Sequence, residues 1–74
     1  MDNNVNVILE KIKVSPIIQS CRKSIVILSS NDVNLSAEDF NKAVEYIWEN
    51  SLVRILKVER KKIYIIKIYA DVTQ

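Results

Sequence analysis

The sequence predicts a small α+β domain in which two or three helices precede a C-terminal antiparallel β-hairpin. Two observations predict this order. Apolar residues recur at helical spacing over residues 36–50. Two runs rich in β-branched and aromatic residues follow at 52–58 and 63–69. A chain of 74 residues has the length of one domain, and we expect that domain to be helical over 4–50 and to carry a hairpin over 52–70.

The first third of the chain fits helix or strand. Apolar spacing over residues 5–14 fits a short helix, although its first half also alternates as a strand would. Ser15 followed by Pro16 is typical of a helix start and predicts a second helix over 16–29. The apolar run at 24–28 also fits a buried strand, so both alternatives stay open here.

The helix at 36–50 has a well-marked start. Ser36 can cap it, with Asp39 three residues later in a capping-box arrangement, and Leu35 and Phe40 fit a hydrophobic staple. The apolar stripe of this helix consists of Phe40, Val44, Ile47 and Trp48. We expect it to be buried in the core against Ile25, Leu28 and one face of the hairpin. Tyr46 lies off that stripe and is a candidate for an interface.

The hairpin register follows from its apolar and charged residues. With Arg60 and Lys61 at the tip, Val58 lies opposite Ile63 and apolar pairs continue along the strands. The tip has no glycine, which tight primed turns prefer. We therefore expect a four-residue loop or a mobile tip.

The composition argues against an enzyme. The chain contains no glycine and no histidine, which removes glycine-rich phosphate loops, Ser-His and Cys-His pairs and imidazole ligands. Glu45 and Glu49 stand four apart on the expected helix, where a solvated helix face explains them. We expect no catalytic residue, no metal site and no cofactor.

We expect an intracellular, cytoplasmic protein. The longest apolar run has four residues, Ile25–Leu28, far below the ~20 of a membrane span. The first residues, Met-Asp-Asn-Asn, do not resemble a secretory signal. The single cysteine, Cys21, forms no internal disulfide, as expected in a reducing compartment. We interpret it as a buried small apolar residue.

Over residues 16–70 the pattern resembles the winged-helix family of DNA-binding domains. The step from helix 36–50 into Asn50-Ser51-Leu52-Val53 is similar to the end of a recognition helix entering a wing, with Ser51 where a glycine is usual. The charged stretch 57–64 is similar to a wing before a Tyr-containing strand. The resemblance implies DNA binding and transcription regulation. Two departures oppose it: the link between residues 29 and 36 is long, and helix 36–50 carries four acids against one lysine.

The basic residues gather in the hairpin, where one acid, Glu59, accompanies them. Arg54 would face Lys67 across the expected register, and an anionic partner would relieve that repulsion. We predict nucleic-acid contacts, mainly to phosphates, from these residues: Arg54, Lys57, Arg60, Lys61, Lys62, Lys67 and Tyr64. Tyr64 and Tyr69 could stack on bases. The prediction is a small DNA-binding regulatory protein; the alternative is a protein–protein interaction module, a subunit or inhibitor of a larger assembly, and in one version a homodimer.

Overall fold

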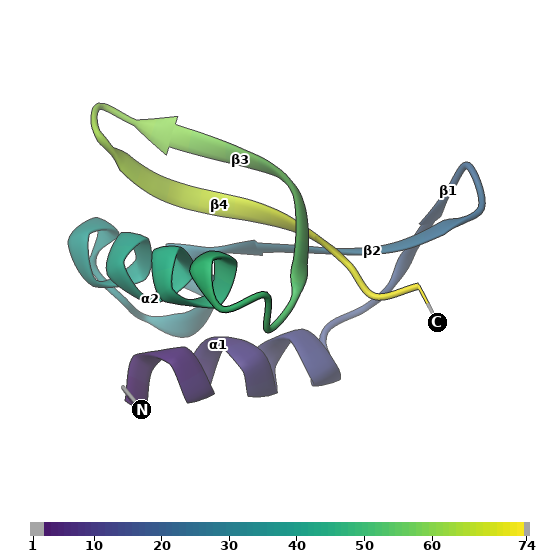
Figure 1. The fold of residues 1–74 in the computed structure, drawn as a ribbon, viewed down its shortest axis with the longest axis horizontal. Helices are drawn as coiled ribbons and strands as arrows, with labels where there is room; N and C mark the ends of the chain where they lie inside the picture. Colours follow the sequence, from purple (N-terminus) through teal and green to yellow (C-terminus); the bar gives the residue numbers. More distant parts are fainter. Residues whose placement is uncertain (1–2, 74) are drawn as a thin grey trace.

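The computed structural model describes residues 3–73 and shows an α+β fold (Figure 1). The predicted class is confirmed at that level. Within the described residues no helix has the length and apolar character that crossing a membrane would need. The elements follow in the order α1 (Asn3–Val14), β1 (Ile18–Ser20), β2 (Lys23–Ser29), the short 3-10 helix η1 (Ser30–Val33), α2 (Ala37–Glu49), β3 (Arg54–Lys61) and β4 (Tyr64–Asp71).

The four strands form one antiparallel sheet in the order β1-β2-β4-β3. Since β2 and β3 each pair antiparallel with β4, they run parallel to one another, and α2 makes the crossover between them. Such crossovers commonly carry a helix that packs back onto the sheet. Figure 1 shows both helices on one side of β2 and β4, and the β1–β2 hairpin extending beyond the helices.

The predicted helix over 16–29 is wrong, and the strand alternative for 24–28 is confirmed. Residues 4–50 are therefore not helical throughout. Ser15 and Pro16 follow the end of α1 instead of starting a helix: the Ser15 hydroxyl donates to the Lys11 carbonyl at 2.6 Å. Proline is common just after a helix end because it cannot continue the helix. The helix expected at 5–14 is confirmed as α1.

The helix expected at 36–50 is confirmed as α2. The Ser36 hydroxyl accepts the Asp39 N–H at 3.1 Å, as the predicted cap requires. The C-terminal end is closed by two backbone bonds, from Ser51 N–H to the Trp48 carbonyl and from Leu52 N–H to the Ile47 carbonyl. Ser51 has φ 52°, so a serine occupies the left-handed position where a helix end usually places glycine.

The core lies between the helices and one face of the sheet. Phe40, Val44 and Ile47 are buried in it as predicted. Trp48 is not: 51% of its surface is exposed, so the prediction for this residue is wrong. The remaining buried apolar residues are Val5, Ile8, Ile12, Val26, Leu28, Ala43, Ile65, Ile68 and Ala70. Leu28 is thus a core residue, whereas Ile25 is half-buried and, by alternation with Val26, lies on the other side of the sheet.

The hairpin exists, but its predicted register is wrong. Val58 pairs with Ile68 and not with Ile63, because the loop lies further along the chain at Lys62 and Ile63. β4 pairs with both neighbours as far as Asp71, which lies opposite Arg54 of β3 and Ile25 of β2. A long-range partner therefore holds β4 in addition to the local pairing within the hairpin.

The tight turns form without glycine. Cys21 and Arg22 have φ values of 48° and 69° in the two-residue β1–β2 turn, the pair of positive values that type I′ turns need. Lys62 has φ 58° in the β3–β4 turn, so the expected four-residue loop is wrong as well. Cys21 is exposed at its turn, which corrects the prediction of a buried thiol. Left-handed backbone costs a residue with a Cβ about 1–2 kcal/mol, and the paired strands hold it.

Candidate nucleic-acid interface

The side of the sheet opposite the helices has no described element packed over it. Strand alternation sends Val26, Ala70 and Ile68 into the core and their neighbours to this other side. We call this surface the open face. Three cross-strand rows form it: Ile25, Asp71 and Arg54; Ile27, Tyr69 and Lys57; Ser29, Lys67 and Glu59.

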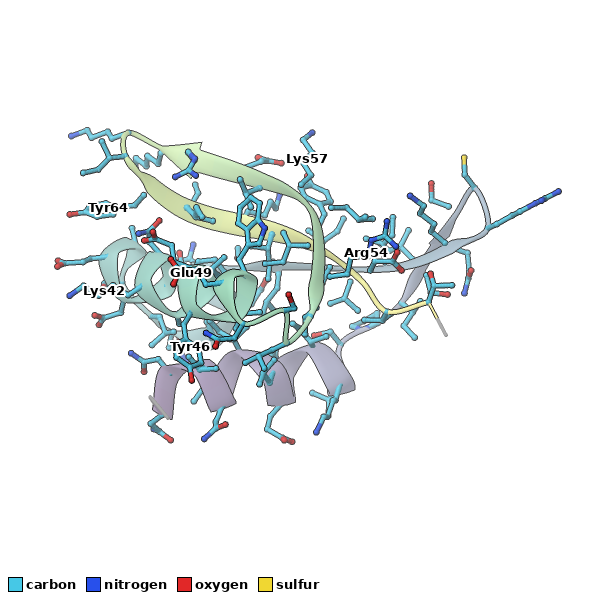
Figure 2. The ribbon with its side chains drawn as sticks, viewed as in Figure 1. Lys42, Tyr46, Glu49, Arg54, Lys57 and Tyr64 are labelled. Atoms are coloured by element: carbon cyan, nitrogen blue, oxygen red, sulfur yellow. The ribbon has the colours of Figure 1, made fainter. Side chains whose placement is uncertain are left out.

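Tyr69 lies at the centre of the open face, on β4 between β2 and β3. Its hydroxyl donates a hydrogen bond to a carboxylate oxygen of Glu59. The Lys57 ammonium lies over the ring, 5.3 Å from the ring centroid, in cation–π geometry. Figure 2 shows Lys57 pointing away from the helices. The ring is thus held by its hydroxyl while one of its faces meets a long, exposed cationic side chain.

The Tyr69–Glu59 hydrogen bond shifts the pKa of both groups. It lowers the pKa of Glu59 from its ordinary 4.5, and the charges of Lys67 and Lys57 act in the same direction. It raises the pKa of Tyr69 above its ordinary 10.0. Glu59 is therefore ionised and Tyr69 is neutral at neutral pH, the states in which this bond is strongest.

Residues of opposite charge are cross-strand partners in both rows that flank the row of Ile27, Tyr69 and Lys57. Arg54 pairs with Asp71, and Lys67 pairs with Glu59. The pKa of Asp71 is lowered chiefly by hydrogen bonds from Thr73, with a smaller contribution from the charge of Arg54. The predicted repulsion between Arg54 and Lys67 is therefore wrong, and so is the argument that an anionic partner must relieve it.

The predicted contact residues do not form one patch. Lys57 and Lys67 lie at the centre of the open face beside Tyr69, and Arg54 lies at one end of it. Arg60 faces the helix side, where it lines a hollow with Glu45, Trp48, Glu49 and Ile65. At the hairpin tip, Lys61 pairs with Tyr64, and Lys62 lies in the turn. Figure 2 shows Lys57 and Tyr64 at well-separated places along the hairpin.

The contact residues predicted from the sequence all lie in the hairpin and include none from β2. Ile25 and Ile27 place half-buried apolar side chains on the open face next to Tyr69. The β-branched run at 24–28 indicates a strand, but a local sequence pattern does not reveal that this strand pairs with β4. Tyr69, a predicted stacking residue outside the predicted set of phosphate contacts, lies at the centre of the open face.

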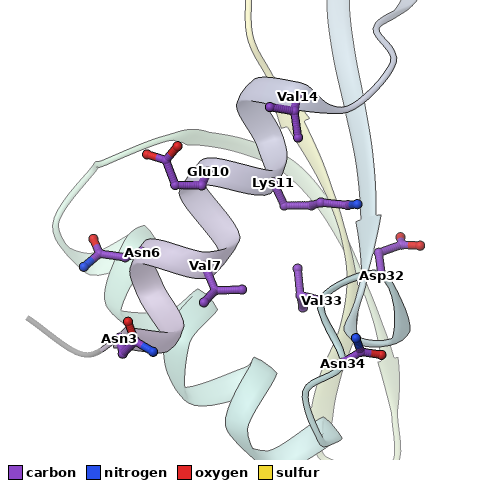
Figure 3. A pocket seen from close by; sticks show the side chains of 9 residues that line it. All are labelled: Asn3, Asn6, Val7, Glu10, Lys11, Val14, Asp32, Val33 and Asn34. Atoms are coloured by element: carbon purple, nitrogen blue, oxygen red, sulfur yellow. The ribbon is translucent and has the colours of Figure 1, made fainter.

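A second surface feature is a groove of about 520 Å³ between α1 and η1. Figure 3 shows Val7 of α1 and Val33 of η1 facing one another across it, with Lys11 and Asp32 at one end. The charge of Lys11 contributes to lowering the pKa of Asp32, although the Ser29 N–H that donates to Asp32 has the larger effect. The groove lies where α1 packs against η1 and is open to solvent, and we assign it no ligand.

Within residues 3–73 no group of three or more cysteine or carboxylate side chains is placed to hold a metal ion. Comparison of the chain with models of protein families, with curated proteins and with solved structures finds no match.

Proposed function

We propose that this protein binds single-stranded nucleic acid through the open face, as a binding protein without catalytic activity. The observation that carries the proposal is the placement of Tyr69 at the centre of an uncovered sheet face with Lys57 and Lys67 beside it. Aromatic rings on an open antiparallel sheet are a recurrent platform for unstacked bases. A stacked base contributes about 1–3 kcal/mol by alanine substitution.

The chemistry of the central row suits a strand of nucleotides. A base that stacks on Tyr69 takes the place of the Lys57 ammonium, which is exposed and flexible enough to reach a neighbouring phosphate. Half-buried Ile25 and Ile27 extend the apolar surface on which further bases can lie. Few groups here can read base edges, so we expect weak sequence preference.

The distribution of charge favours the open face over the helices. α2 carries Glu38, Asp39, Glu45 and Glu49 against Lys42 alone, so it is a poor candidate for insertion between phosphates. A winged-helix domain reading duplex DNA with α2 has less support for this reason. The order of elements gives it less support again, because strands occupy the place of its middle helix.

The test is a titration of fluorescently labelled single-stranded DNA, single-stranded RNA and duplex DNA at two salt concentrations. We expect single strands to bind more tightly than duplex. If three phosphates are neutralised, the log–log salt slope is about −2 for single strands. Tyr69→Ala should weaken binding about tenfold or more, since one stacked base is lost. Tyr69→Phe should keep most of the affinity because it keeps the ring.

The matched control is Tyr46→Ala, which removes a tyrosine that is 40% exposed on α2. Figure 2 shows Tyr46 on the helix side of the molecule. This variant should bind like the parent. Absence of single-strand binding at low salt, or equal loss in the Tyr46 and Tyr69 variants, would contradict the proposal.

A further inference from the structure

β3 forms one edge of the sheet, and no described element pairs with its outer side. The strand contains one extra residue, Leu56, between the pairs of Ile55 and Lys57. The second irregularity adds its extra residue on β4, at Ile66. From Lys57 to Lys61, β3 itself therefore runs without interruption and presents a row of backbone groups that another strand can pair with.

Trp48 lies beside this edge on the helix side of the sheet. It is 51% exposed and lines a hollow of about 310 Å³ with Glu45, Glu49, Arg60 and Ile65. It also lines a second hollow of about 260 Å³ with Val53 and Ile55. α2 packs chiefly on β4, and the β3 residues Ile55 and Arg60 in these hollows place Trp48 next to β3, the edge strand. A strand added to this edge would bury its indole ring.

The charge along the edge restricts what can pair there. Lys57 and Lys61 project from the open side of β3 and are exposed, and the only acid between them, Glu59, accepts the Tyr69 hydroxyl. A second copy of β3 paired antiparallel about Glu59 would bring Lys57 against Lys61 and Glu59 against Glu59, which is unfavourable across a strand pair. Acidic side chains opposite Lys57 and Lys61 would instead be favourable.

The geometry points to the β3 edge as a docking site for an extended protein segment in which apolar and acidic residues alternate. Alternation puts every second side chain on the same side of a strand. The apolar side chains would then pack against Trp48 on the helix side, and the acidic ones would lie opposite Lys57 and Lys61 on the open side. This partner is a different ligand from the nucleic acid proposed for the open face, and the two sites share Lys57.

The chain contains one tryptophan, which makes Trp48 a direct reporter of this site. The probe is a short blocked peptide in which isoleucine alternates with glutamate; its counterpart carries lysine in place of glutamate. We expect the acidic peptide to shift Trp48 emission to shorter wavelength in a saturable titration, because the indole ring becomes buried. The basic peptide should leave the emission unchanged.

Two variants locate the site by anisotropy of the labelled acidic peptide. Lys57→Glu combined with Lys61→Glu should weaken binding about tenfold or more. Trp48→Ala should weaken it as well. Lys13→Glu on α1, also an exposed lysine, is the matched control and should bind like the parent.

The inference is overturned if neither peptide changes the emission, as expected where lysines only protect the edge from pairing. It is also overturned if both peptides bind equally, or if Lys13→Glu weakens binding as much as the β3 variants. Oligonucleotide binding by the Lys13 variant and by Trp48→Ala, measured in parallel, reports on the open face independently.

Discussion

Tyr69 joins the three features that define the open face: an aromatic ring, a carboxylate and a lysine. Its hydroxyl reaches Glu59 on the neighbouring strand, and its ring meets the ammonium of Lys57 two residues earlier on that strand. Few interactions can fix the orientation of a side-chain ring on the face of a sheet. The Glu59 hydrogen bond fixes the orientation of this one, and a ring held in place loses less entropy when a base stacks on it.

The Tyr69–Glu59 bond predicts a pH dependence. Because the folded-state pKa of Glu59 is lowered, its contribution to stability is present above the ordinary pKa of 4.5 and is lost as pH falls through the folded-state value. Because the pKa of Tyr69 is raised, its contribution is present below 10.0 and is lost as pH rises through the raised value. Tyr69→Phe should move the Glu59 carboxyl pKa back up, as an NMR titration of that carboxyl carbon would measure. An unchanged Glu59 pKa in the variant would contradict the assigned cause.

At the scale of elements, most features of α2 can be predicted from its own sequence. Its cap and its apolar stripe are both local features, and Ser36, Phe40, Val44 and Ile47 take the predicted roles. Trp48 is not buried as predicted, because the burial of a residue on this helix depends on whether the sheet extends under it. Helical spacing identifies which residues share a face, but it does not reveal that β4 lies under the centre of the stripe and β3 at its margin.

Substitutions in α2 should separate these two cases. Phe40→Ala removes a fully buried ring and should cost about 3–5 kcal/mol of the free energy of unfolding. Trp48→Ala removes a larger but half-exposed side chain and should cost about 1 kcal/mol or less. Urea unfolding of the two variants and the parent gives both values. Equal losses would mean that Trp48 is a core residue after all.

Less of the hairpin than of α2 can be predicted from its own sequence. Both strands were predictable from their β-branched and aromatic composition, but the register was not, since Val58 can meet an apolar residue in more than one alignment. In the structure the turn lies at Lys62, which has a positive φ, and β2 pairs with the other side of β4 in the resulting alignment. A positive φ at a lysine has no signature in the sequence, whereas glycine at that position would have indicated the turn.

At the scale of the whole molecule, the contacts that build the candidate site are long-range. β2 and β4 are separated in sequence by α2 and β3, yet their pairing brings Ile27 beside Tyr69. The sequence indicated a basic hairpin with tyrosines, and that part of the prediction agrees with Lys57 and Lys67 on the open face. It did not indicate which basic residues share a surface, because Arg60 faces α2 while its neighbours in the strand do not.

Charge is also separated on the scale of the molecule. The acids of α2 lie on the helix side of the sheet, whereas the rows of the open face carry Arg54, Lys57 and Lys67 against Glu59 and Asp71. A polyanion approaching the protein is therefore repelled more strongly by α2 than by the open face, which has a small excess of positive charge. This separation, together with the central tyrosine, is the basis for assigning single-stranded nucleic acid to the open face.

The measurement that tests this most directly is an NMR titration of ¹⁵N-labelled protein with an unlabelled single-stranded oligonucleotide. We predict that the amide shifts concentrate on the open face, at Ile27, Lys57, Lys67 and Tyr69, and leave α1 and the exposed side of α2 unchanged. Shifts confined to α2 or to the β1–β2 turn, or no shifts at low salt, would contradict the assignment.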